Sequence, residues 1–474
     1  MAIELPAPPP PTRDIYTNRT LNLRAIRAIG YDMDYTLVHY HVDVWERRAF
    51  EYARDRMVES GLPVGHLEFD DQLVERGLII DTHAGNVVKA DRFGYVKAAA
   101  HGTAPLPFVE LRELYGRLFV DLRDERWVFM STLFDLSLAG LYSQCVDLLD
   151  AGRLPGVMGY RDLFARVRRG LDSAHIEGAL KAEIMQDPAS YVDLDPDGPR
   201  ALLDQKDAGK KLLLITNSEW VFTDAMMRFA YERFLPAGMR WRDLFHMVII
   251  QARKPSFFTD SNPIFEVIND QGHLRPLVGL PQAGGVYLGG HAGLVEQALG
   301  LSGLDFLYVG DHIFSDVNVS KSTVRWRTAL VLRELEREIE AAHDFHADEV
   351  ELGARMAEKS TLEQQLAQLR LLRQRRKHRR PGAVDAPQGQ IDAEHERIKQ
   401  ALAQLDTEIA PLAERASRVQ GRWGPVMRAG IDKSHMARQI ERYADVYTSR
   451  VSNFLFATPH VYLRPPKSSL PHDP

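Results

Sequence analysis

The sequence contains one cysteine, Cys145, among 474 residues. A single thiol cannot form an internal disulfide or supply an all-cysteine metal site, which indicates a reducing compartment. No run of about 18 apolar residues occurs, and the start MAIELPAPPPPTRDIY has neither the basic nor the apolar region of a secretory signal. We therefore expect a cytoplasmic protein with no membrane partner and a disordered, proline-rich segment over residues 1–20.

The sequence also lacks a surplus of basic charge, since its formal net charge is -6. It therefore has no overall positive field for holding nucleic acid. With 45% hydrophobic residues, the chain can bury a large core and divide into two or three structural units. These properties favour a globular protein that acts on a small molecule, and they predict no nucleic-acid partner.

Four apolar runs end in polar residues: IRAIGYDMD, KKLLLITNS, HMVIIQARK and DFLYVGDHIFSD. Such runs are typical of strands that are buried on both faces of a parallel sheet. Helical patterns between them, such as WVFTDAMMRFAYERFL, predict crossover connections. The expected fold is α/β, with its core in residues 21–44 and 200–344. Ligands of such sheets bind beyond the carboxyl ends of the strands.

The interval over residues 45–199 is too long for one crossover and predicts an inserted α+β cap. Leucines and isoleucines near heptad spacing in residues 345–420 predict a helical hairpin. Its basic tip, RQRRKHRRPGAVDAPQGQ, is interpreted as a solvated turn rather than as a binding site for an anionic partner. Residues 421–474 are expected to form a C-terminal helix and tail that pack on the core.

Two carboxylates, Asp32 and Asp34, follow the first apolar run in the stretch YDMDYTLVHY. In an extended backbone, residues i and i+2 point to the same side, so the two charges would repel each other. This cost indicates a chemical role or a counter-ion. Taken singly, DMDYT, ITNS, the Lys-Pro of ARKPSFF and GDHIFSD are equally consistent with ordinary turns and helix caps.

Together and in this order, these four segments resemble the four motifs of the haloacid dehalogenase superfamily of phosphohydrolases. More specifically, the sequence resembles the cytosolic purine (IMP/GMP) 5'-nucleotidase family from about residue 28 to ERYADVYTSRVSNFLF, including GLIIDTHAGNVVKADRFGYVKAAAHG and KSTVRWRTALV. The resemblance implies a haloacid dehalogenase-like, Rossmannoid sheet with the cap and the hairpin as insertions. It also implies Mg2+ as the cofactor and a homo-oligomer, either a dimer or a tetramer.

The resemblance assigns the reaction to the two carboxylates. Asp32 would attack phosphorus and form an aspartyl-phosphate. Asp34 would protonate the leaving oxygen and later take a proton from water. Lys254 would add a fixed positive charge, and the phosphoryl oxygens would be bound by Thr216, Asn217 and Ser218.

The same resemblance implies a site for the metal ion. Asp32, Asp311 and the backbone carbonyl of Asp34 would hold Mg2+, because hard cations prefer oxygen ligands. Asp316 would orient the ligands or the bound water molecules. Thr36 would brace the loop that follows the carboxylate pair.

The cap helix VRRGLDSAHIEGALK matches the segment that recognises the nucleobase in the family. Arg168 would donate to a purine 6-oxo group and Asp172 would accept from N1–H, and adenine lacks both groups. Phe134 and His175 would stack on the base, with Lys181 near the ribose or the phosphate. Without the resemblance, Arg168 and Asp172 form an ordinary i,i+4 ion pair, Phe134 is a core residue and His175 is a surface residue.

The sequence departs from the family at two places. Asp135 stands where the family has asparagine, and an extra acid near the base is expected to alter the preference for base or sugar. After the fourth motif, Ser322 replaces an expected lysine beside Lys321, Arg325 and Arg327, and an acidic C-terminal tail is missing. Activation by ATP is therefore not expected.

The resulting prediction is a Mg2+-dependent 5'-nucleotidase that hydrolyses IMP and GMP and also transfers the phosphoryl group to nucleosides. Two alternatives stay open: a phosphatase of the same mechanism that acts on another phosphomonoester, and a scaffold that acts through the helical hairpin. Substrate profiling distinguishes the first alternative from the predicted nucleotidase. The second is disfavoured because the chain keeps all four residues of the proposed site: Asp32, Asp34, Lys254 and Asp311.

Overall fold

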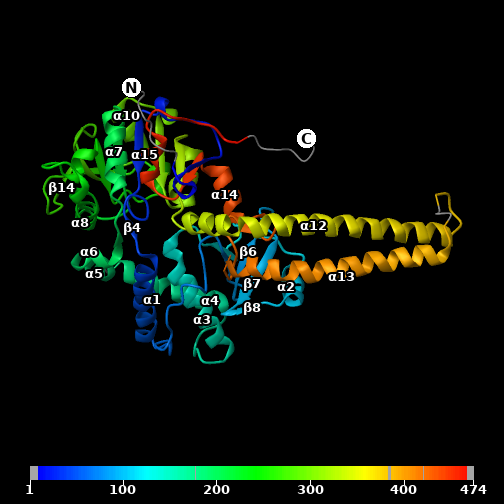
Figure 1. The fold of residues 1–474 in the computed structure, drawn as a ribbon. Coiled ribbons are helices and arrows are strands. Elements are labelled where there is room, and N and C mark those ends of the chain that lie inside the picture. Colours follow the sequence, from blue (N-terminus) through cyan, green and yellow to red (C-terminus); the bar gives the residue numbers. More distant parts are fainter. Residues whose placement is uncertain (1–8, 177, 383–385, 420, 467–474) are drawn as a thin grey trace, which may run out of the picture. The chain divides into compact units, whose positions relative to one another are not determined.

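The computed structural model describes residues 9–176, 178–382, 386–419 and 421–466; the side chains of residues 173–176 and 417–419 are outside the described set. The chain divides into two compact units, one formed by residues 1–336 and 425–474 and the other by residues 337–424. Figure 1 shows the elements of both units. No described helix is long and apolar enough to cross a membrane.

The first unit contains a ten-stranded sheet in the order β1-β20-β17-β16-β3-β11-β12-β15-β13-β14. In that order its strands are Ile15–Thr17, Val446–Thr448, Arg327–Val331, Phe306–Gly310, Ala28–Tyr31, Lys211–Ile215, Met247–Ile250, Val286–Gly289, Ile264–Val267 and Leu274–Pro276. Every pair from β20 to β15 is parallel. At the edges the pairing is antiparallel: β1 pairs with β20, and β13 pairs with both β15 and β14. The α/β fold with a parallel-rich sheet is therefore confirmed.

The apolar runs explain why the centre of this sheet is stable. All four residues of β3 and β12 and all five residues of β16 are buried, as expected for parallel strands that are covered on both faces. The helices of this part of the unit are α7 Asp197–Asp207, α8 Trp220–Tyr231, α9 Ser256–Thr259, α10 Ala292–Leu299, α11 Val319–Thr323, α14 His435–Tyr443 and α15 Phe454–Ala457.

The N-terminal segment differs from the expectation of disorder over residues 1–20. Ile15–Thr17 form β1, which pairs with β20, and residues 1–8 lie outside the described residues. Leu21–Asn22 (β2) pairs with Tyr462–Leu463 (β21), and a small hairpin joins β18, Arg428–Ala429, to β19, Asp432–Lys433. Without β1, the strand β20 would leave unpaired backbone N–H and C=O groups at the edge of the sheet. β1 forms hydrogen bonds with these groups, and this pairing orders the segment after the prolines.

The cap is the segment between β4, His39–Tyr40, and β10, Val192–Asp193. It holds a five-stranded antiparallel sheet with β8 Ala104–Pro105, β7 Val96–His101, β6 Asn86–Ala90, β5 Ile79–Asp81 and β9 Trp127–Phe129. Its helices are α1 Val42–Glu59, α2 Phe108–Tyr115, α3 Leu136–Asp150, α4 Tyr160–Ile176, α5 Ala179–Gln186 and α6 Pro188–Tyr191. Helix α3 packs against α1, α4 and the cap sheet (Figure 1).

The second unit is a helical hairpin formed by α12, Leu335–Lys377, and α13, Gln388–Val419, apart from the first two residues of α12. Ile391, Ile398 and Leu405 recur every seven residues along α13 and are buried. Ion pairs join the two helices, including Lys359 with Asp406 at 2.6 Å. The heptad pattern in the sequence therefore predicted this hairpin, and its basic tip includes residues 383–385, which lie outside the described residues.

Glu46 on α1 is a fully buried acid that contacts α3. Its Oε2 accepts a hydrogen bond from the N–H of Ser137 at 2.9 Å, in the first turn of α3, whereas Oε1 is buried without a hydrogen bond among the described residues. Burial raises the pKa of Glu46 to about 8, and the nearby charge of Asp135 adds to this shift. The folded protein therefore keeps a proton on Glu46 that an unfolded chain loses above about pH 4.5.

Replacing Glu46 by glutamine should therefore remove a pH-dependent loss of stability. As pH rises from 5 to 8, the wild-type free energy of unfolding should fall relative to that of Glu46→Gln by on the order of 3 kcal/mol. Urea titrations at several pH values measure this difference. Glu59→Gln, at the exposed end of the same helix, should behave like the wild type; parallel pH profiles for wild type and Glu46→Gln would contradict the prediction.

Candidate active site

The parallel strands deliver polar residues to one edge of the large sheet. Asp32 follows β3, Thr216 follows β11, Lys254 lies shortly after β12, and Asp311 follows β16. Because these four strands are parallel neighbours, their carboxyl ends lie at the same edge. The residues predicted from the strand endings are therefore gathered there.

Lys254 lies between two carboxylates. Its Nζ is 2.7 Å from Oδ1 of Asp32 and 2.9 Å from Oδ1 of Asp316, and it donates a hydrogen bond to the hydroxyl of Tyr308 at 3.1 Å. Burial disfavours the charged ammonium, but the charges of Asp316 and Asp32 outweigh this effect and raise the pKa of Lys254 well above its ordinary value. Lys254 is therefore a permanently positive group in the site.

Asp32, Asp311 and Asp316 form a cluster whose ligand oxygens all lie within 4.8 Å of one another. Asp311 and Asp316 are buried, and the side chain of Asp32 is 13% exposed. Burial raises the pKa of Asp32 to about 6, although Lys254 opposes the shift; burial followed by the charges of Asp316 and Asp32 raises the pKa of Asp311 well above its ordinary range. Three crowded carboxylates with hard oxygen ligands fit a divalent cation.

Two glycines allow this packing. A Cβ on Gly310 would lie 2.5 Å from Oδ2 of Asp316, so a larger residue at the end of β16 would displace that carboxylate. The same oxygen accepts a hydrogen bond from the N–H of His312 at 3.1 Å. A Cβ on Gly30 would lie 2.8 Å from the ring of Tyr308, the residue that contacts Lys254. The glycines of GYDMD and VGDH therefore serve close packing.

The two carboxylates of YDMDYTLVHY contact different groups. Strand β3 ends at Tyr31, so Asp32 and Asp34 lie in the following turn, and the expectation that they share one face of a strand was wrong. Oδ1 of Asp34 accepts a hydrogen bond from the hydroxyl of Tyr40 at 2.6 Å, and Oδ2 accepts one from Ser218 Oγ at 2.7 Å. Burial raises the pKa of Asp34, and the charge of Lys181 opposes that shift.

The segment after β11 is braced internally. The amide of Asn217 donates to the backbone carbonyl of Lys254 at 3.1 Å and accepts from its N–H at 2.7 Å. Thr216 Oγ1 accepts a hydrogen bond from the N–H of Ser218 at 3.0 Å. The Asn217 side chain thus joins two strand-end loops, and the contacts of Thr216, Asn217 and Ser218 with phosphoryl oxygens stay a prediction.

Phe134 lies in the short turn Leu133–Asp135 that precedes α3. Its ring centroid is 4.7 Å from that of Tyr35, which follows Asp34, so Phe134 lies beside the turn that carries the carboxylates. The Asp135 carboxylate accepts hydrogen bonds from the N–H groups of Ser131 at 2.9 Å and Thr132 at 3.2 Å, and burial raises its pKa to about 6. Asp135, which stands where the family has asparagine, therefore closes this turn through its hydrogen bonds to the backbone.

Of the predicted base-recognition residues, Arg168 and Asp172 are exposed on the cap, whereas Lys181 contacts the core. Arg168 Nε is 4.0 Å from Asp172 Oδ2, and both side chains are 60% exposed on α4. Lys181, on α5, donates to Ser218 Oγ at 3.1 Å and also pairs with Glu219 at 3.1 Å, so it reaches the core. The His175 side chain lies outside the described residues, and its stacking role stays a prediction.

Several residues that contact the site were missed from the sequence. The buried Arg76 donates to the carbonyl of Asp311 at 3.3 Å across 235 positions, and Thr132 Oγ1 donates to the Asp311 carboxylate at 3.1 Å. Nothing local in the sequence indicates either contact. Tyr40 and Tyr308 were also missed, although Tyr40 ends the stretch that carries both catalytic candidates. Tyr40 lies only 6 positions after Asp34 in the chain, and this short separation could have indicated a contact between them.

A parallel sheet that brings a lysine, a second carboxylate and a cluster of three aspartates that fits a divalent cation to one edge defines an enzyme for phosphoryl transfer. Comparison with known proteins agrees. The 5' nucleotidase family matches residues 15–474, and the chain belongs to this family. It is a phosphoric monoester hydrolase that acts on nucleoside monophosphates.

The chain is similar to proteins of the same family in mammals. It is 28% identical over 476 residues to human 5'-nucleotidase domain-containing protein 2, covering 97% of this chain and 85% of the relative. The rat protein of the same name is 28% identical over 478 residues, covering 97% and 80%. A solved archaeal beta-phosphoglucomutase from Pyrococcus sp. strain ST 04 superposes with a TM-score of 0.31 at 11% identity, covering 65% of this chain and 87% of that chain.

Proposed function

We propose that this chain is a Mg2+-dependent 5'-nucleotidase that hydrolyses the 6-oxopurine nucleotides IMP and GMP through an aspartyl-phosphate. The observation that carries the proposal is the different set of contacts that each of the two carboxylates makes. Asp32 lies with Lys254 and the acidic cluster, whereas Asp34 lies against two hydroxyls. These contacts support attack by Asp32 and proton transfer by Asp34.

The contacts of Asp32 support one choice of attacking atom. Lys254 Nζ and the N–H of Met33 both reach Oδ1, at 2.7 Å and 2.8 Å, and Oδ2 is the nucleophile of the proposed reaction. As the bond from Oδ2 to phosphorus forms, the bond from phosphorus to the ribose 5'-oxygen breaks. Asp34 gives its proton to that oxygen, and the nucleoside leaves.

Hydrolysis of the intermediate reverses the role of Asp34. A water molecule attacks phosphorus, the ionised Asp34 takes its proton, and the bond to Oδ2 breaks to give inorganic phosphate. A nucleoside hydroxyl in place of water would accept the phosphoryl group. Asp32, Asp311, Asp316 and the backbone carbonyl of Asp34 would hold Mg2+, which when bound neutralises charge on the phosphoryl oxygens.

Phosphate release from a substrate panel tests the proposal. The panel contains IMP, GMP, AMP, CMP, UMP, pyridoxal phosphate and sugar phosphates, each with Mg2+ and with EDTA. Mg2+-dependent preference for IMP and GMP is the expected result. Preference for another ester would support the proposed roles of the catalytic residues but contradict the proposed recognition of the purine base. Inactivity on every ester would contradict the proposed function.

Arg168→Ala should lower kcat/KM for IMP by about 10- to 100-fold, the loss that follows removal of one charged hydrogen bond. Two features support a role in binding: Arg168 is exposed, and an exposed ion pair with Asp172 at 4.0 Å contributes little to stability. Hydrolysis of p-nitrophenyl phosphate, which lacks a base, should not change. Steady-state kinetics on both substrates measure these effects.

Arg161→Ala is the matched control, because Arg161 is an exposed arginine on the same helix and pairs with Glu125. This control should retain the wild-type ratio of IMP to AMP hydrolysis. If Arg168→Ala also retains that ratio, the α4 residues do not read the 6-oxo group.

A further inference from the structure

Tyr40 contacts Asp34 and belongs to none of the motifs assigned above. Its hydroxyl donates to Oδ1 of Asp34 at 2.6 Å, while its buried ring packs against Trp45 at a centroid distance of 4.5 Å and against Tyr35 at 5.3 Å. Aromatic contacts on two sides restrict the ring, so the hydroxyl has a defined position. Tyr40 therefore constrains where the Asp34 carboxyl lies.

The second carboxylate oxygen of Asp34 is hydrogen-bonded to a residue of the core sheet's loops. Ser218 Oγ donates to Oδ2 at 2.7 Å, and Lys181 Nζ donates to Ser218 Oγ at 3.1 Å. With one donor on each oxygen, both the position and the plane of the Asp34 carboxyl are defined. Tyr40 provides one of these two restraints from outside the four motifs.

Tyr40 lies where the chain enters the cap. It belongs to β4, which pairs antiparallel with β10, where the chain leaves the cap, and its partner in register is Val192. His39 is opposite Asp193 in the same pair. We call β4 and β10 the hinge pair. The register of the hinge pair fixes the position of Tyr40 along β4. It therefore determines whether the Tyr40 hydroxyl can reach the Asp34 carboxylate.

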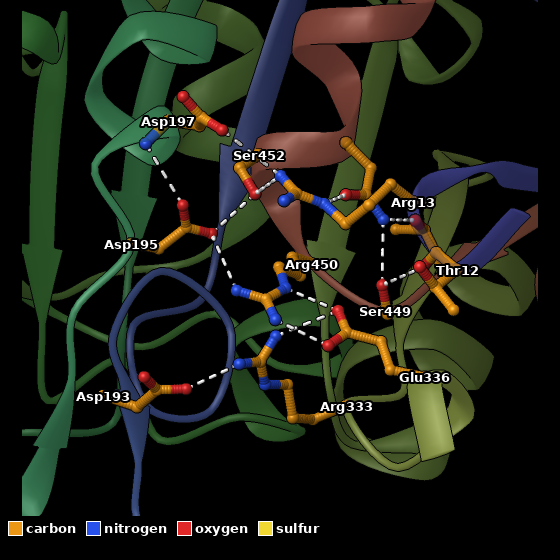
Figure 2. Close-up of polar contacts among 12 residues, drawn as sticks. Thr12, Arg13, Asp193, Asp195, Asp197, Arg333, Glu336, Ser449, Arg450 and Ser452 are labelled. Atoms are coloured by element: carbon orange, nitrogen blue, oxygen red, sulfur yellow. Dashed lines mark hydrogen bonds and ion pairs between the residues drawn. The ribbon is translucent and has the colours of Figure 1, made fainter. Parts of the chain in front are cut away.

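An ionic cluster anchors the β10 side of the hinge pair (Figure 2). We define the hinge cluster as Asp193, Asp195, Arg333, Glu336, Arg450 and Ser452. Arg333 pairs with Asp193 at 2.5 Å, and Ser452 donates to Asp195 at 2.6 Å. Arg450 makes two contacts with Glu336, both at 2.5 Å, and lies 3.8 Å from Asp195. Arg333, shortly after β17, thus contacts β10 directly, and the C-terminal residues Arg450 and Ser452 contact Asp195 just beyond it.

We infer that Tyr40 is a positioning residue for proton transfer by Asp34, and that the hinge cluster maintains the register that brings Tyr40 to it. The inference rests on the proposed function, because that function assigns the proton transfer to Asp34. A general acid must lie within hydrogen-bond reach of the leaving oxygen, and displacement by about 1 Å can cost about 100-fold in rate. The hinge pair therefore links the cap to the catalytic step.

Tyr40→Phe tests this inference, because phenylalanine keeps the ring and removes the hydroxyl. Two substrates separate the effects: the best nucleotide of the panel, whose leaving alkoxide needs a proton, and p-nitrophenyl phosphate, whose nitrophenolate leaves without one. In single-turnover experiments, nucleoside release should slow by about 10- to 100-fold. The nitrophenolate burst should change by less than about three-fold, and KM for the nucleotide should stay within about two-fold of wild type.

Equal losses on both substrates, or no loss on the nucleotide, would overturn the role of Tyr40. Tyr52→Phe is the matched control, because its hydroxyl donates to Glu183 within the cap and should not affect either substrate. If the wild type cleaves p-nitrophenyl phosphate but no nucleotide, the proposed substrate fails, and the same comparison is made with the alkyl phosphate ester that it does cleave.

Asp193→Asn tests the hinge cluster without altering Tyr40. Loss of the ion pair with Arg333 should slow nucleoside release by about 3- to 10-fold and spare the nitrophenolate burst. Combined with Tyr40→Phe, it should cause no further loss, because both changes act through one contact. Additive losses in the double variant, or an unaffected Asp193→Asn variant, would show that the hinge cluster does not act through Tyr40.

Discussion

Replacing Asp32 by asparagine should abolish phosphate release, with a fall in kcat of about 10,000-fold or more. The amide is nearly isosteric with the carboxylate but is not a competent nucleophile, so no aspartyl-phosphate can form. Lys254 would keep its contact with Asp316 at 2.9 Å, which preserves a partner for the buried ammonium. The loss should therefore reflect chemistry rather than unfolding.

Release of phosphate from IMP with Mg2+, measured beside thermal melting, checks this prediction. Asp71→Asn is the control, since Asp71 is an exposed aspartate outside the site. A second readout is a phosphorylated peptide containing Asp32 after acid quenching, present in the wild type and missing in Asp32→Asn. A variant that retains the wild-type rate within tenfold would exclude Asp32 as the nucleophile.

Removal of divalent cations should abolish activity and lower thermal stability. The acidic cluster brings three carboxylates within 4.8 Å, and a bound cation offsets their repulsion. A ligand at 100 times its Kd stabilises the folded state by about 2.7 kcal/mol, so Mg2+ should raise the melting midpoint by about 3–5 °C. Titration of EDTA-treated protein with Mg2+ measures both effects.

Asp311→Asn should lose both responses to Mg2+. Because burial and the charges of Asp316 and Asp32 raise the pKa of Asp311, the cation-free variant should be at least as stable as the cation-free wild type. Asp71→Asn should retain the full shift. A normal response to Mg2+ in Asp311→Asn would place the cation outside the acidic cluster.

Local patterns in the sequence were sufficient for the main elements. The apolar runs LLLI and FLYVG predicted strands buried on both faces, and their polar endings predicted which residues meet at one edge of a parallel sheet. The spacing of Ile391, Ile398 and Leu405 predicted the helical hairpin. These inferences succeed because periodicity and strand endings are properties of short segments.

The tertiary structure alone decided how the site is held. Arg76 reaches Asp311 across 235 positions, and β1 joins the sheet by pairing with β20 near the other end of the chain. Strand β3 ends at Tyr31, so Asp32 and Asp34 lie in a turn and contact different groups, and the hinge pair brings Tyr40 to Asp34. Such contacts depend on chain topology and on where each turn leaves its strand, and neither is encoded in a local pattern.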